Sequence, residues 1–250
     1  MQVVVDGLLT SYESLGSGPA VLLLHGWGDT AKTFAAIQKE LSKQALTVAL
    51  DLPGFGGTQT PKDVWGLDEY TQFVAHFLKK IAAPKLKLIV GHSNGGAIAI
   101  HGLSRGTLHA DNLALLASAG VRGTQKGKMQ ALKLMTKAGK ILVSPLPKSV
   151  KQTLRRKLYT SVGSDMLVAE HLQESFKRVV SEDVRAEAAM LTLPTVIVYG
   201  DQDDATPTSY GKLFNQAIAG SRLQIVPGAG HFVHLDNPQE VTAALKGLLA

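Results

Sequence analysis

The sequence has 250 residues, a mass of 26.5 kDa and a hydrophobic fraction of 45%, which suits one sizeable core with a modest insertion and excludes a disordered or collagen-like chain. It contains no cysteine, which excludes disulfides, thiolate nucleophiles and cysteine-ligated zinc, so covalent chemistry must use an oxygen or nitrogen nucleophile. The net charge of +6 is concentrated in residues 121–157, which hold eleven Lys or Arg and no Asp or Glu.

The first residues, MQVVVDGLL, lack the basic segment and long apolar stretch of a signal peptide. No apolar run approaches the length of about 20 residues that a membrane span needs. We therefore expect a soluble, cytoplasmic protein.

Two short β runs, 2–5 and 8–13, flank Asp6-Gly7, a pair suited to a tight hairpin turn. Almost continuously apolar runs then recur at 21–26, 46–54, 85–92, 112–118, 195–201 and 222–228. Continuous rather than alternating apolar character is typical of strands that are buried on both faces of a parallel sheet.

Stretches with apolar residues three or four apart, such as 70–81 and 241–248, indicate helices between or after these runs. The alternation predicts an α/β fold with a mostly parallel sheet of about eight strands covered by helices. It breaks once, because 121–190 shows only helical patterning. We expect a core domain formed by 1–120 and 191–250, and a helical cap insertion, 121–190, over the carboxyl edge of the sheet.

The fragment LIVGHSNGGAIAI, residues 88–100, leads from a buried strand through a glycine-rich turn into a helix, as a G-x-S-x-G motif requires. A nucleophilic Ser93 must stand on a tight, strained turn, and Gly91 and Gly95 let strand and helix approach closely. The backbone N–H of Asn94, at the helix N-terminus, would face a developing oxyanion. By itself the motif also fits a Ser93 that only caps the helix.

A histidine and an aspartate complete the constellation, in the chain order Ser, acid, His. His231 lies in a glycine-rich loop after a buried strand, from which an imidazole can reach the nucleophile. His234 competes for this role, whereas His92 is discounted because adjacent side chains on such a turn point apart. Three acids are available in the loop that follows the run 195–201: Asp201, Asp203 and Asp204.

With these motifs in this order, the sequence resembles the α/β-hydrolase family. The family's acid loop commonly reads G, acidic, any, Asp and later Pro, and the match to residues 200–203 and Pro207 implies that Asp203 is the acid. The segment HGWG, residues 25–28, resembles the family's H-G-x-G turn, which implies a second oxyanion N–H from Trp27 and a structural role for His25. The resemblance thus implies an α/β-hydrolase fold with the following site residues: Ser93, Asp203 and His231 as the catalytic triad, Trp27 and Asn94 as the oxyanion hole.

Serine at position 93 departs from the dehalogenase and epoxide-hydrolase branches, which attack with a carboxylate. HGWG and a compact insertion resemble carboxylesterases that demethylate an ester bound to acyl carrier protein, and GHSNGG resembles carbon–carbon-bond hydrolases. We expect a serine hydrolase for a carboxylic ester or thioester, with carbon–carbon-bond hydrolysis as an alternative. We expect no cofactor and no metal.

Two other functions stay open. Gly26-x-Gly28-x-x-Ala31, with Asp51 about 20 residues further on, has the spacing of a dinucleotide-binding oxidoreductase, but Trp27 would crowd a pyrophosphate. A non-catalytic binding protein on the same fold is the other alternative.

The basic segment 121–157 fits three interpretations: a solvated helical face, a docking surface for an acidic substrate or carrier, or a helix on an anionic membrane. The solvated face is the preferred one. We expect no nucleic-acid partner, because no binding motif accompanies the charge.

Overall fold

A computed structural model describes residues 1–122 and 172–249 of the chain. Its eight-stranded sheet has the order β1-β2-β4-β3-β5-β6-β7-β8. β1 and β2 pair antiparallel with each other, β2 pairs antiparallel with β4, and the remaining neighbours are parallel. The strands are β1 (Gln2–Val5), β2 (Leu8–Leu15), β3 (Ala20–Leu24), β4 (Leu46–Leu50), β5 (Leu86–His92), β6 (Ala110–Leu116), β7 (Thr195–Gly200) and β8 (Arg222–Val226).

The predicted mostly parallel sheet and the N-terminal hairpin are confirmed. Asp6 and Gly7 have φ of 47° and 78°, the left-handed conformation that a tight hairpin turn between twisted strands requires. The apolar run 46–54 ends as a strand at Leu50, because the chain turns at the following Leu52–Phe55 segment, where Phe55 N donates to Leu52 O at 3.0 Å.

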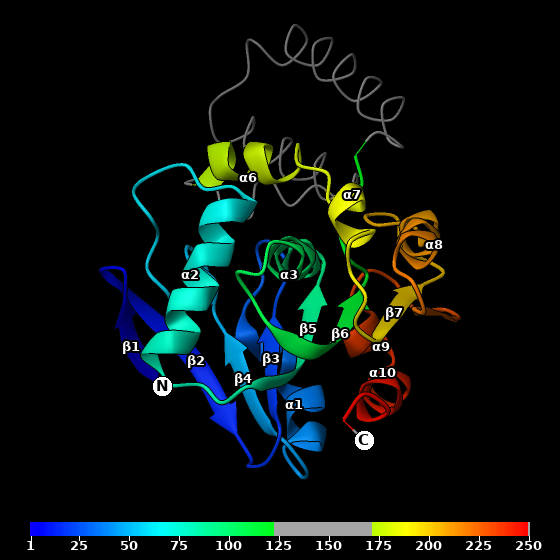
Figure 1. Cartoon of the computed structure of the whole chain (residues 1–250), viewed down its shortest axis with the longest axis horizontal. Helices are drawn as coiled ribbons and strands as arrows, with labels where there is room; N and C mark the ends of the chain where they lie inside the picture. Colours follow the sequence, from blue (N-terminus) through cyan, green and yellow to red (C-terminus); the bar gives the residue numbers. More distant parts are fainter. Residues whose placement is uncertain (123–171, 250) are drawn as a thin grey trace, which may run out of the picture.

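Helices cover both faces of the sheet (Figure 1). One apolar core lies between the sheet and α2, α3, α7 and α8, and a second lies between the sheet and η1, α1, α9 and α10. The helices are η1 (Ala31–Phe34), α1 (Ala35–Leu41), α2 (Leu67–Lys80), α3 (Asn94–Ser104), α6 (Gln173–Val179), α7 (Arg185–Ala188), α8 (Thr208–Ala217), α9 (Val233–Asp236) and α10 (Pro238–Lys246).

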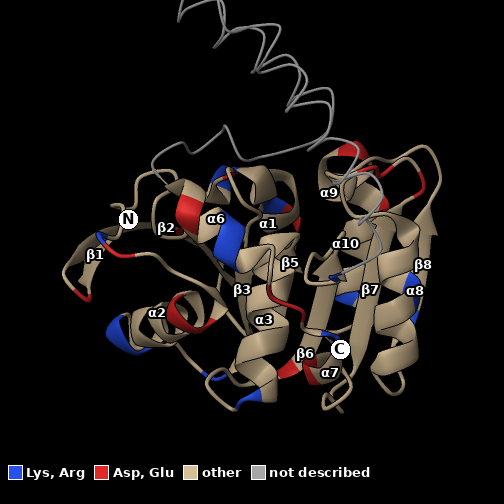
Figure 2. Ribbon diagram, turned by 90° about the horizontal axis from the view of Figure 1, so that it is seen from above, with Lys and Arg blue, Asp and Glu red and all other residues tan. Residues whose placement is uncertain are grey.

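Strand β3 shows why the apolar runs are continuous. Val21 and Leu23 are fully buried in the core beneath α1 and α10, and Leu22 and Leu24 are fully buried in the core beneath α2 and α3. Successive side chains of a strand point to opposite faces, so a strand with a core on each side has no polar positions. Figure 2 shows Lys, Arg, Asp and Glu mostly on helices and loops, and β3, β4 and β7 carry none of them.

Of the expected helical insertion 121–190, the structure describes residues 121–122 and 172–190, which contain α6 and α7. The remainder of that insertion lies outside the described residues, and so does the basic segment 121–157 except for Val121 and Arg122. The boundaries of the insertion and its solvated face therefore stay predictions. In Figure 1, α6 and α7 lie on the side to which the arrowheads of β5 and β6 point. Ser175 Oγ accepts a hydrogen bond from Trp65 N at 3.0 Å, which joins α6 to the loop before α2.

Within residues 1–122 and 172–249, no helix combines the length and the apolar character needed to cross a membrane.

Candidate active site

Ser93 lies immediately after β5 and begins α3. It has φ of 51° and ψ of −115°, a backbone conformation that is rare for a residue with a side chain and that marks strain. Four backbone hydrogen bonds hold it: Ser93 N donates to Leu116 O at 3.0 Å, and Ser93 O accepts from Gly96 N at 3.0 Å, Ala97 N at 3.3 Å and Ala119 N at 2.9 Å. The expected strained turn between strand and helix is therefore present.

Glycine at position 95 makes this turn possible. A Cβ added to Gly95 would lie 2.1 Å from Leu24 O, and a Cβ added to Gly91 would lie 2.5 Å from Gly95 O. Both contacts involve backbone atoms, so no side-chain rotation can relieve them. The first helical turn of α3 thus packs directly against the end of β3.

We expect Gly95→Ala to lower the free energy of unfolding by about 3 kcal/mol, because the backbone of β3 or α3 must shift to admit the methyl group. Urea denaturation would measure the change. Gly247→Ala is the matched control, since its Cβ would meet its nearest atom, Ala244 O, at an ordinary 3.4 Å. Equal stability of the two variants would contradict this account of the turn.

Asp203 and His231, which follow β7 and β8, form a pair. His231 Nδ1 lies 2.9 Å from Asp203 Oδ2; the Asp203 side chain is fully buried, and that of His231 is 16% exposed. Asp203 Oδ1 accepts from the backbone N of Ala205 and of Thr206, each at 2.8 Å. The backbone therefore fixes the orientation of the carboxylate independently of its contact with the imidazole.

The neighbouring acids have other roles. Asp201 is exposed, and its Oδ1 accepts from Gly228 N at 2.7 Å, which fixes the turn after β8. Asp204 is exposed. Of the three candidate acids, Asp203 is the one that contacts His231.

His231 lies beside the Ser93 turn. Its ring centroid is 4.8 Å from that of His92, the residue before Ser93, and its carbonyl oxygen accepts from His92 Nε2 at 3.0 Å. His92 thus holds the His231 loop against the turn. His234 instead has its Nε2 2.8 Å from Thr33 Oγ1 in η1, so the competing base does not pair with Asp203.

The HGWG turn also passes the serine. A Cβ on Gly26 would lie 3.1 Å from Ser93 Cβ. Among the described residues, no partner accepts a hydrogen bond from the backbone N–H of Trp27 or of Asn94. The Trp27 ring packs at 5.0 Å from that of Phe55 and 5.3 Å from that of Phe176, so the indole forms an aromatic wall under α6.

His25 is a structural residue, as expected. Its Nδ1 donates to Gly26 O at 2.7 Å and its Nε2 accepts from Leu52 N at 2.9 Å, which ties the HGWG turn to the loop after β4. Burial lowers the pKa of the His25 imidazole, so the ring stays neutral and both hydrogen bonds keep this direction.

In the dinucleotide-binding alternative, Asp51 would be the acidic residue that binds the ribose. Its Oδ1 accepts from Ala31 N at 2.7 Å and its Oδ2 accepts from Gly57 N at 2.8 Å. Both oxygens thus bind the chain's own backbone, in a residue only 8% exposed. An acidic residue that recognised a ribose would need an oxygen available to the ligand.

Thr206 is a site residue that the sequence analysis did not identify. Its Oγ1 lies 2.7 Å from Asp203 Oδ2 and 3.1 Å from His231 Nδ1. The same hydroxyl lies 2.9 Å from Ala117 O, which follows β6. A hydroxyl residue three positions after a candidate acid, just before a helix, is the signal that could have indicated it.

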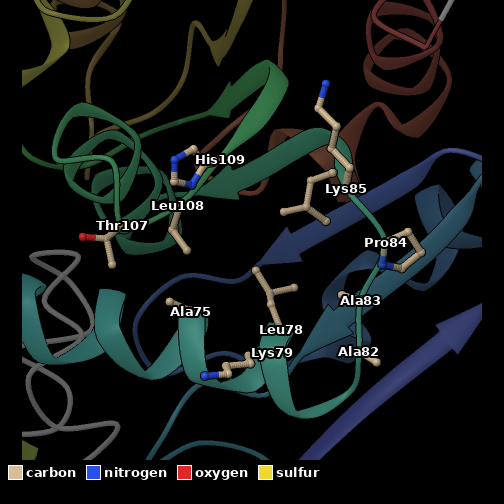
Figure 3. A pocket seen from close by; sticks show the side chains of 11 residues that line it. Ala75, Leu78, Lys79, Ala82, Ala83, Pro84, Lys85, Thr107, Leu108 and His109 are labelled. Atoms are coloured by element: carbon tan, nitrogen blue, oxygen red, sulfur yellow. The ribbon is translucent and has the colours of Figure 1, made fainter.

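A pocket of about 280 Å³ opens at another part of the molecule (Figure 3). Its lining comes from the end of α2, residues 82–86 and residues 107–109, so it lies at the amino ends of β5 and β6. Ser93, Asp203 and His231 follow the carboxyl ends of their strands, and none of them lines this pocket.

Residues 21–245 match the sequence model of the Alpha/beta hydrolase family. A pimeloyl-(acyl-carrier protein) methyl ester esterase of Chromobacterium violaceum is 28% identical over 253 residues, which cover 93% of this chain and 95% of that protein.

Solved structures share the fold at lower sequence identity. A bacterial membrane phospholipase A superposes with a TM-score of 0.80 at 24% identity, covering 100% of this chain and 84% of the other. A meta-cleavage product hydrolase from Pseudomonas fluorescens superposes with a TM-score of 0.74 at 21% identity, covering 100% of this chain and 97% of the other.

Proposed function

Since the chain belongs to the alpha/beta hydrolase family, we propose that it is a serine hydrolase that cleaves a carboxylic ester or thioester, with Ser93 as nucleophile, His231 as base and Asp203 as the acid that orients the base. The family and its esterase relative support a hydrolase. The observation that carries the finer assignment is the 2.9 Å contact between His231 Nδ1 and the buried carboxylate of Asp203, beside the strained turn of Ser93.

The contact between His231 Nδ1 and Asp203 indicates which nitrogen of His231 accepts the proton of Ser93. Because Nδ1 donates to Asp203, Nε2 of His231 is the nitrogen with the free lone pair. Nε2 takes the proton of Ser93 Oγ as this oxygen attacks the carbonyl carbon, and the imidazolium that forms is stabilised by the carboxylate.

The tetrahedral intermediate places its negative charge on the former carbonyl oxygen. The backbone N–H groups of Trp27 and Asn94 would donate to this oxyanion. The carbon–oxygen or carbon–sulfur bond of the ester then breaks, and the leaving alcohol or thiol takes the proton from His231. A water molecule, deprotonated by His231, attacks the acyl-enzyme, releases the carboxylic acid and restores Ser93.

The surroundings of Trp27 indicate a substrate with an apolar portion. Trp27 is 6% exposed and its ring packs against the rings of Phe55 and Phe176, so the wall next to the expected oxyanion hole is aromatic. An acidic carrier of the ester would suit the basic segment 121–157. That partner stays a proposal from the sequence, because the segment lies almost wholly outside the described residues.

A fluorophosphonate probe tests the assignment of the nucleophile. We expect stoichiometric labelling of Ser93, located by mass spectrometry of peptides, because the phosphonyl group traps an activated serine. Ser93→Ala should lose the label, whereas Ser104→Ala, at the other end of α3, should keep it.

Turnover of p-nitrophenyl esters of increasing chain length would measure the acyl specificity in parallel. Labelling at another serine, or none together with no ester turnover, would contradict the proposed function.

A further inference from the structure

Three neighbouring residues, Asp29, His92 and His234, have side-chain atoms that the proposed reaction does not use. Each residue offers a ligand atom within 4.8 Å of those of the other two, and the buried atoms without a hydrogen-bond partner among the described residues are Asp29 Oδ2, His92 Nδ1 and His234 Nδ1. His92 and His234 are at most 1% exposed. Leaving buried polar atoms without partners is costly, so such a cluster requires a physical explanation.

The hydrogen bond at Nε2 of each histidine bears on whether Nδ1 of the same ring carries a hydrogen or a lone pair. His92 Nε2 faces the carbonyl oxygen of His231 at 3.0 Å, so Nε2 carries the hydrogen and Nδ1 presents a lone pair. His234 Nε2 lies 2.8 Å from Thr33 Oγ1. Where this hydroxyl accepts from Nε2, Nδ1 of His234 presents a lone pair too.

We infer that Asp29, His92 and His234 bind one divalent transition-metal ion of the Zn²⁺ class. Two imidazole nitrogens and one carboxylate oxygen are donors that Zn²⁺ and its neighbours in the first transition row accept, whereas Mg²⁺ and Ca²⁺ prefer oxygen ligands throughout. With His234 in that tautomer the cluster presents three lone pairs, and a single water molecule, which has two hydrogens, leaves one of them unpaired. A cation satisfies all three. The inference departs from our sequence-based expectation of no metal.

The outer contacts of the ligands resemble those of built metal sites. A metal-binding histidine commonly donates its second N–H to a carbonyl or similar oxygen, which fixes the ring, and His92 and His234 face His231 O and Thr33 Oγ1 in this way. The carboxylate is held as well, because Asp29 Oδ1 accepts from Thr30 N at 2.8 Å. All three ligands therefore have fixed orientations.

Metal binding requires the ligand atoms to move closer together. With metal–ligand distances of 2.0–2.1 Å, tetrahedral ligands are about 3.4 Å apart, so two ligand atoms that are 4.8 Å apart must approach each other by about 1.4 Å. The ligands come from the loop after β3, the last residue of β5 and helix α9, and the same three segments of the chain carry Trp27, Ser93 and His231 within three residues of them. A bound ion would therefore tie together the three segments that form the candidate active site and would stabilise the fold.

Metal binding can be tested independently of catalysis. Tag-free protein, stripped with EDTA and dialysed against Zn²⁺ or Co²⁺, should retain one equivalent per chain by mass spectrometry of the metal. Zn²⁺ should raise the Tm. Asp29→Asn and His234→Gln should each weaken Zn²⁺ binding at least about tenfold. His76→Gln is the matched control, because His76 forms an exposed pair with Asp6 at 2.7 Å and should leave binding unchanged.

A measurement on the wild type covers the case in which a ligand variant fails to fold. Nitrogen-15 chemical shifts of the histidine rings should move on addition of Zn²⁺ at Nδ1 of His92 and His234 and stay fixed at His76. Absence of Zn²⁺ and Co²⁺ binding by the wild type would overturn the inference. So would full retention of the metal by both Asp29→Asn and His234→Gln, or its loss in His76→Gln alone.

Discussion

Ser93→Ala and His231→Ala are each expected to lower kcat for ester hydrolysis by roughly 10⁵-fold or more, and the double variant is expected to be little worse than either single variant. The nucleophile and its base act as one unit. Without the imidazole, the Ser93 hydroxyl keeps its proton, and without the hydroxyl the imidazole has no proton to take. The two losses therefore do not add.

Initial rates with a p-nitrophenyl ester, together with thermal unfolding to verify the fold, would measure this. His234→Ala is the comparison for the base. His234 is fully buried against Phe34 and bonded to Thr33, so its removal should reduce stability more than turnover. If His234→Ala lost turnover with normal stability while His231→Ala kept its turnover, the base would be assigned incorrectly.

Asp203→Asn is expected to lower kcat by about 10⁴-fold while the protein stays folded. The amide oxygen can still accept from the backbone N of Ala205 and Thr206, as Oδ1 does now. The amide nitrogen would then face His231 Nδ1. Because that nitrogen is a donor, the imidazole must accept at Nδ1 and carry its hydrogen at Nε2, the tautomer that cannot deprotonate Ser93.

Asp201→Asn and Asp204→Asn are the matched controls in the same loop. Both residues are exposed, and neither contacts His231, so turnover should stay close to that of the wild type. Because Asp201 Oδ1 fixes Gly228, Asp201→Asn keeps an acceptor there. A large loss at either control with Asp203→Asn unaffected would contradict the assignment.

The sequence by itself determined the fold class. The near-continuous apolar runs predicted a helix-covered parallel sheet, and β3 shows the reason: Val21 and Leu22, adjacent in the chain, enter different cores. The turn of Ser93 was predictable from the G-x-S-x-G motif. The glycine at position 91 is required by contacts within one strand, one turn and one helix start, whereas the glycine at position 95 is required by the backbone of the neighbouring β3.

The tertiary structure alone decided which polar side chains meet. Sequence placed three aspartates in one loop, and only the fold buries the carboxylate of Asp203 against His231 while Asp201 turns to Gly228. Thr206 joins that pair through the same packing.

The cluster of Asp29, His92 and His234 has no sequence signature, because its members belong to three separate segments of the chain and their spacing matches no metal motif. It exists because α9 packs against η1 and places His234 beside Thr33. Side-chain periodicity is local and can be read from the chain. The convergence of single atoms from distant loops depends on strand order and helix packing, which only the folded structure sets.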